Sequence, residues 1–177
     1  MRGFAVITLA CGAILVAGIA AAQVAPKALD SFKEICLPGA SHIDTVAAFE
    51  RTGWTEAPDE LSQFFNQDVV DPDAEERFIL NYQGGVILAA ALSERRGLLA
   101  KRDMTVCMVR VFTDDPTRMR ADFLSRMDVS PDQDVDSEEV RANIWFEILG
   151  LELVAFRAVK IQENMWSVTT YRTLING

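Results

Sequence analysis

The chain has 177 residues; half are hydrophobic, and 26 acidic side chains outnumber 17 basic ones, for a formal net charge of −9. This length and apolar content are typical of one domain with a packed core, not of intrinsic disorder. The negative charge argues against a nucleic-acid partner, and the single histidine excludes zinc sites and proteases that need two.

Residues 1–22 have the pattern of a secretory signal peptide. Arg2 precedes an uncharged, mostly apolar run that ends in three alanines. A basic start, an apolar centre and a small-residue end are the marks of such a peptide, so cleavage is expected before Gln23. The alternative is an uncleaved membrane anchor, because the run just reaches the length that spans a bilayer. We therefore expect a signal peptide over 1–22 and one mature domain over 23–177.

Cleavage would remove one of the three cysteines and leave Cys36 and Cys107. An even number of cysteines in an exported protein predicts a disulfide between them. The alternative is two unpaired thiols in the core, because both residues lie in apolar sequence and free cysteines are commonly buried. A weak lipoprotein acylation pattern around Cys11 is a further alternative to cleavage before Gln23.

The first part of the mature chain has helical patterns. Apolar residues at helical spacing predict a helix over 27–37, which a Pro-Gly pair ends. Ser41 is a suitable N-cap for a second helix, and Gly53 is a suitable residue to close it. Pro58 suits the start of a third helix. The acidic stretch 68–77 is expected to be a connecting loop or a short helix.

Strand patterns begin after this stretch. Residues 78–82 and 86–92 flank Gln83-Gly84-Gly85, which is a hairpin signal. A second turn is expected at 94–97. It leads to a strand within 98–113, whose β-branched and apolar centre is typical of a central strand.

The remaining chain combines one helix with further strands. A helix is expected to start at 114–116, and 128–139 is expected to be an acidic loop. Residues 144–149 fit either a strand or the end of a helix. Residues 151–161 and 165–174 predict a final hairpin. Helices followed by antiparallel strands predict an α+β fold, with helices packed on one face of the sheet.

The densest acidic stretch, 128–139, is a candidate calcium site. Alternating oxygen donors suit a hard cation, and the twelfth residue counted from the first aspartate is a glutamate, as in an EF-hand loop. The sixth residue is Gln133, however, where that loop needs glycine. The alternative is a solvated loop whose last acids cap a following helix. The candidate ligands are Asp128, Asp132, Asp134, Asp136 and Glu139.

A basic cluster stands out in this acidic chain. Such charge asymmetry can select an anionic ligand or an acidic partner, although charged strand ends also serve simply to keep sheet edges unpaired. The cluster consists of Arg95, Arg96, Lys101 and Arg102.

The sequence carries no recognisable catalytic or cofactor motif. Gly84-Gly85 is not followed by the Gly-Lys-Ser/Thr of a phosphate loop, so no cofactor is expected. His42 lacks a nucleophile motif and is expected to be an ordinary surface or capping residue. The acids at 71–76 could supply a carboxylate pair for glycoside hydrolysis, but charged loops are usually just solvated.

Three features resemble short exported Gram-negative bacterial proteins of unknown function: Phe32-x-x-x-Cys36, the Gly53-Trp54 pair, and a second cysteine, Cys107, in a strand-rich segment. The resemblance implies export and a disulfide, and it implies no activity.

The sequence thus favours a periplasmic or secreted, non-enzymatic interaction or ligand-binding module. Its partner is expected to be another periplasmic or envelope protein or a ligand, with no nucleic acid and no membrane span after cleavage. The alternative is a small hydrolase that uses carboxylates from distant loops.

Overall fold

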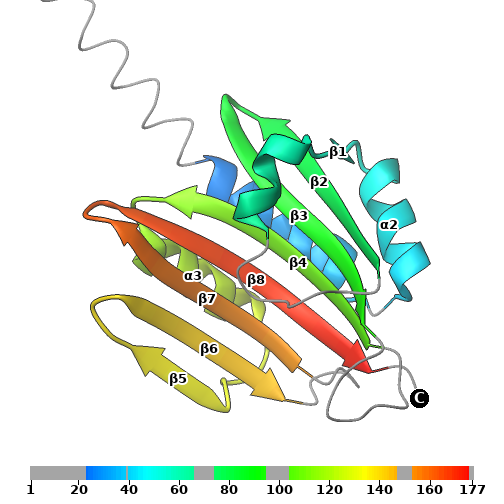
Figure 1. Cartoon of the computed structure of the whole chain (residues 1–177). Helices are drawn as coiled ribbons and strands as arrows, with labels where there is room; N and C mark the ends of the chain where they lie inside the picture. The colour runs from blue at the N-terminus through cyan, green and yellow to red at the C-terminus, as the bar shows by residue number, and fades with distance from the viewer. Residues whose placement is uncertain (1–22, 39, 66–73, 95–103, 147–152, 176–177) are drawn as a thin grey trace, which may run out of the picture.

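The computed structural model describes residues 23–38, 40–65, 74–94, 104–146 and 153–175. Within them, eight strands form one antiparallel sheet in the order β1-β2-β3-β4-β8-β7-β6-β5, accompanied by a few helices (Figure 1). The expected α+β class is confirmed at this level. The signal-peptide prediction concerns residues 1–22, which lie outside the described residues.

The bounds of the elements are as follows. An N-terminal helix, described over 23–31, continues into the π-helical turn η1 (Phe32–Cys36), and the other helical segments are α2 (His42–Arg51), the 3₁₀ helix η2 (Asp59–Phe64) and α3 (Pro116–Arg126). The strands are β1 (Thr55–Glu56), β2 (Ala74–Tyr82), β3 (Gly85–Glu94), β4 (Met104–Thr113), β5 (Gln133–Asp136), β6 (Val140–Phe146), β7 (Leu153–Gln162) and β8 (Met165–Ile175).

The helix boundaries follow from local capping chemistry. Ser41 Oγ accepts a hydrogen bond from the backbone N–H of Asp44 at 3.3 Å and begins α2. Gly53, with φ +87°, follows the end of α2 in the left-handed conformation that glycine adopts at little cost. In α3, Asp115 accepts from the N–H of Arg118 at 3.0 Å. The helix predicted at Pro58 forms as the short 3₁₀ helix η2.

The first hairpin has a tighter turn than the sequence suggested. Only Gln83 and Gly84 connect β2 to β3, and both have positive φ, as a type I′ turn requires. The strands are also longer than predicted. Residues 74–77 belong to β2, so the prediction of a loop or short helix there is wrong, because pairing with β3 extends the strand.

The acidic segment 128–139 is also partly strand. Its residues 133–136 form β5 and pair with β6, and the next element is a strand that begins at Val140. The alternative of Asp136 and Glu139 capping a following helix is therefore wrong. The ambiguity at 144–149 is settled as strand up to Phe146, and the rest lies outside the described residues. The final hairpin, β7–β8, is confirmed.

The disulfide between Cys36 and Cys107 is present. Their Cα atoms are 5.4 Å apart and their positions are 71 residues apart in the sequence. The bond joins the end of the N-terminal helical segment to β4, near the centre of the sheet. Both cysteines are buried. The predicted pairing is confirmed, and the bond links the first helical segment to a central strand.

Buried apolar residues form two clusters, one on each face of the sheet. On the inner face, Leu29, Phe32, Phe49 and Phe123 from the N-terminal helix, η1, α2 and α3 contribute to one cluster with alternate residues of the strands. On the outer face, η2 and the residue after it, Phe65, pack on β3 and β4. Figure 1 shows the N-terminal helix and α3 behind the sheet and η2 in front of it.

The outer-face cluster includes no residue of β5, β6 or β7 among those that the structure describes. On these strands Val135 and Phe146 are each 45% exposed, and Ile161 is 42% exposed. Strand alternation places the side chains of Val135 and Phe146 on the outer face. This area, β5 to β7 on the outer face, is called the open half of the outer face below.

No helix among the described residues is long and apolar enough to cross a membrane.

Candidate functional site

A pocket of about 450 Å³ lies where the chain leaves the β1 edge of the sheet. β1 pairs with β2 only at Phe78 and Ile79, and the N–H of Ala57 donates to the carbonyl of Arg77 at 2.9 Å before the chain turns into η2. Because β1 is so short, no described strand pairs with the start of β2 on that side, and this part of β2 borders the pocket. We call it the edge pocket.

The lining of the edge pocket is strongly acidic. The described residues that line it include one cation, Arg77, and two buried aromatic residues, Trp54 and Phe78. The five carboxylates come from α2, β1, η2 and β2, and they are Glu50, Glu56, Asp59, Glu75 and Glu76. This excess of negative charge would favour a positively charged ligand.

Two of the five carboxylates contact a basic side chain. Glu75 Oε2 lies 2.6 Å from Arg77 Nη2, and this hydrogen bond is the largest cause that raises the pKa of Arg77 above its usual value. Burial opposes that rise, and the negative charges of Glu75 and Asp59 add to it. Glu76 Oε2 lies 2.6 Å from His42 Nε2, so the only histidine of the chain holds the first turn of α2 to β2.

The other three carboxylates, Glu50, Glu56 and Asp59, are exposed. None of the ion pairs within the described part of the chain includes them. They therefore keep the edge pocket electronegative after the contacts of Glu75 and Glu76 are taken into account.

Aromatic packing makes the floor of the edge pocket rigid. The ring of Phe49 stacks on Phe78 with centroids 4.9 Å apart and meets the ring of Trp54 edge-on at 5.2 Å. Trp54 and Phe78 are each 4% exposed, so their side chains have little freedom to rearrange. The pocket thus combines fixed apolar walls with carboxylates at its rim, an arrangement that suits a cation with an organic body.

Sequence reasoning found only part of this site. Glu75 and Glu76 belonged to the carboxylate stretch considered for hydrolysis, whereas Asp71 and Asp73 of that stretch lie outside the described residues. Residues from α2, β1 and η2 were missed, because nothing in the sequence shows that these short elements meet on β2.

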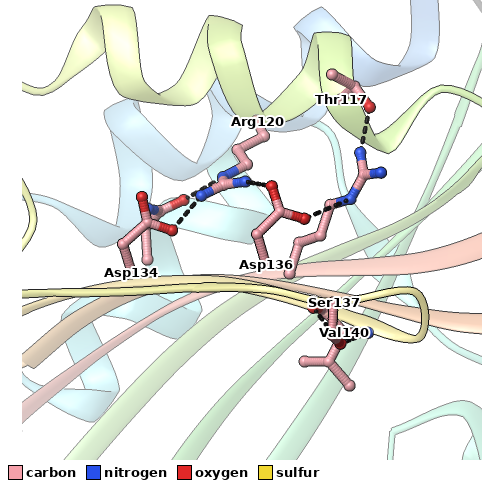
Figure 2. Close-up of polar contacts among 8 residues, drawn as sticks. Thr117, Arg120, Asp134, Asp136, Ser137 and Val140 are labelled. Carbon is pink, nitrogen blue, oxygen red and sulfur yellow. Dashed lines mark hydrogen bonds and ion pairs between the residues drawn. The ribbon is translucent and has the colours of Figure 1, made fainter.

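The calcium candidates do not gather around one point. No group of three or more His, Cys, Asp or Glu residues in the described ranges could hold a metal ion. Asp134 and Asp136 instead pair with Arg120 of α3, at 2.8 Å for Asp136, and Asp136 also lies 3.3 Å from Arg141 Nε (Figure 2). Asp132 Oδ2 accepts a hydrogen bond from the N–H of Phe146 at 2.8 Å. Asp128 and Glu139 are exposed.

The basic cluster cannot be placed. Arg95, Arg96, Lys101 and Arg102 all fall within 95–103, outside the described residues.

Comparisons with known proteins identify no relative. No family model, no curated protein and no solved structure matches the chain. We therefore infer the function from the edge pocket and from the physical chemistry of its residues.

Proposed function

We propose that this protein is an exported, non-enzymatic binding module that takes a small organic cation, an amine or a guanidinium compound, into the edge pocket. The observation that carries the proposal is that the described lining of the pocket has five carboxylates and one arginine, above a rigid aromatic floor. In this proposal the longer helices share the inner face and leave the β1 edge accessible to the ligand.

Export is the second part of the proposal. The disulfide between Cys36 and Cys107 fits an oxidising compartment, because cytosolic proteins rarely keep such bonds. The periplasm is the compartment we propose, and the signal-peptide pattern of residues 1–22 supplies the route to it.

Electrostatics and shape would share the recognition. Glu56 and Asp59 at the rim would attract the cationic head, and the walls at Trp54 and Phe78 would contact its apolar body. Because the rim carboxylates are exposed, their attraction is screened by salt, and binding should weaken as ionic strength rises. A protein partner could use the same pocket through a lysine or arginine side chain.

The test is calorimetric titration of the protein with cadaverine, choline and arginine methyl ester, each compared with a neutral compound of similar shape. We expect the cations to bind and the neutral compounds not to bind. A Glu56→Gln, Asp59→Asn double variant should bind about tenfold more weakly, because each exposed charge contributes less than about 1 kcal/mol.

The matched control is Glu163→Gln, which removes a carboxylate from the exposed turn between β7 and β8. It should leave affinity unchanged. Equal binding of neutral and cationic compounds, or equal affinity of the double variant and the control, would contradict the proposal.

A small carboxylate-dependent hydrolase is the second candidate, and the edge pocket is the observation that favours it. Carboxylates from separate elements meet there, as general acid and base catalysis requires. Incubation with a panel of chromogenic glycosides separates the two functions. Product release that a Glu75→Gln or Glu76→Gln variant abolishes would favour the hydrolase, whereas a bound cation recovered unchanged would favour the binding module.

A further inference from the structure

A buried arginine lies beside the disulfide. Arg172 of β8 is the register partner of Cys107 of β4 and is only 3% exposed. Directly opposed residues on neighbouring strands have their side chains on the same face and in contact range. Arg172 Nη1 also donates a hydrogen bond to the carbonyl oxygen of Cys36 at 2.7 Å. Arg172 thus bonds to the backbone of one cysteine and lies opposite the other in the sheet.

This guanidinium group has unmet bonding capacity. Its Nε and Nη2 atoms are buried and have no hydrogen-bond partner in the described part of the chain. Burial lowers the pKa of Arg172 to about 10, and burial is the only cause of that shift. A buried cation without a counter-charge is destabilising, so a group that could supply a negative charge beside Arg172 would be favourable.

We propose that Arg172 makes Cys36–Cys107 a redox-responsive disulfide, because reduction creates a thiolate that pairs with the buried guanidinium group. In the oxidised protein the sulfurs are neutral and accept hydrogen bonds only weakly. In the reduced protein a sulfur can carry the negative charge that none of the described ion pairs supplies to Arg172. A neighbouring cation lowers the pKa of a thiol, which favours the reduced, ionised state of the pair.

The reductant is a dithiol. One of its thiolates attacks a sulfur of the disulfide, the S–S bond breaks, and the electron pair stays with the departing cysteine as a thiolate. The second thiol of the reductant then displaces the other cysteine and forms the reductant's own disulfide. Two electrons pass to the protein. The cysteine beside Arg172 remains a thiolate, and its counterpart takes up one proton.

Reduction would release a defined segment. The bond holds η1 to β4, and η1 continues the helix that buries Leu29 and Phe32 in the inner-face cluster. Because both cysteines are buried, a dithiol reaches them only when η1 lifts from the sheet. The redox state would therefore set how firmly the N-terminal helix is held.

The experiment measures the fraction of oxidised protein across a series of reduced and oxidised dithiothreitol ratios. The variant is Arg172→Met, which keeps the length of the side chain and removes the charge. We expect the variant's disulfide to be about tenfold harder to reduce, which corresponds to about 30 mV in midpoint potential. A midpoint equal to that of the unmodified protein would overturn the proposal.

The chain offers a matched control in Arg110, a second arginine that is 3% exposed and lies on β4, next to β8. Arg110 donates to Thr169 at 2.8 Å and occupies the outer face, away from the cysteines. Arg110→Met should leave the midpoint unchanged even if it lowers stability. A midpoint that moves equally in both variants would show an effect of stability alone and would contradict the proposal.

Two further measurements keep the proposal testable if Arg172→Met folds poorly. Arg172→Lys preserves the charge and should keep a midpoint near that of the unmodified protein. In the reduced protein, the rate of alkylation by iodoacetamide against pH should reveal one thiol that ionises below the usual range of cysteine. Ordinary ionisation of both thiols would overturn the role of Arg172.

Discussion

The two halves of the sheet are stabilised in different ways. From β2 to β4, described residues cover both faces: the N-terminal helix and α2 contribute to the inner cluster, and η2 with Phe65 covers the outer face. From β5 to β7, α3 packs on the inner face, while apolar side chains such as Phe146 stay exposed on the outer face. The first half also carries the disulfide.

The second half depends on polar contacts at its edge. Arg120 reaches from α3 to Asp134 and Asp136 on β5, and it donates to Asn143 on β6 at 2.8 Å. The two aspartates are more than half exposed, so water and salt screen these ion pairs. We expect the first half to be the more stable, because it buries apolar side chains on both faces and carries a covalent bond.

The largest expected effect tests the covalent clamp in the first half. A Cys36→Ser, Cys107→Ser double variant should lose about 4 kcal/mol of unfolding free energy, because the bond closes a long loop in the unfolded chain. Urea denaturation monitored by circular dichroism measures the loss. A change below about 1 kcal/mol would show that the clamp contributes little to stability.

The next prediction compares the two halves on one face. Leu88 lies in the outer-face cluster and is 2% exposed, so Leu88→Ala should cost about 2–4 kcal/mol. Ile144 is a partly exposed residue on the open half, so Ile144→Ala should cost about 1 kcal/mol or less. Equal costs in urea denaturation would mean that the two halves do not differ as described.

A smaller effect is expected at the polar edge. Arg120→Ala should destabilise the protein by about 1 kcal/mol at low salt, and the difference should shrink in concentrated salt. The control is Arg118→Ala, which removes an exposed arginine from the same helix. A loss for Arg120→Ala that is independent of salt would point to packing and not to charge.

The smallest effect concerns alkaline pH. The pKa of Arg172 is about 10 in the folded protein, below the usual 12.5. Between these two pH values the unfolded chain therefore binds more protons than the folded protein does. The destabilisation from the buried charge is full below pH 10 and is relieved as the pH rises above it. The protein should therefore gain stability relative to Arg172→Met as the pH rises from about 10 to about 11. A constant difference across that range would contradict the pKa shift.

Much of the fold could be predicted from local patterns. Ser41 and Asp115 begin helices with their own side chains, and the Gln83-Gly84 turn specifies the first hairpin. β5 could not be predicted, because its acidic residues are typical of a solvated loop. Only pairing with β6 and the contact with Arg120 turn that segment into an edge strand.

The candidate site could be predicted from the sequence even less well than the fold. Residues such as Glu50, Trp54 and Asp59 are far from β2 along the chain, and only the meeting of α2, β1 and η2 makes a pocket of them. Individually each is an ordinary acid or aromatic residue, so no motif marks them.

The amino-acid sequence by itself determined the caps at Ser41 and Gly53, the first and last hairpins, the acidic balance and the expected pairing of Cys36 with Cys107. Caps and hairpins depend on residues that are close together in the sequence, and the charge and the number of cysteines follow from the composition. Only the tertiary structure decided that Arg172 lies beside that disulfide, that the edge pocket exists, and that one half of the outer face stays open. These features depend on which distant segments become neighbours in the fold. The burial of a side chain and the charges around it are defined only once those segments have packed together.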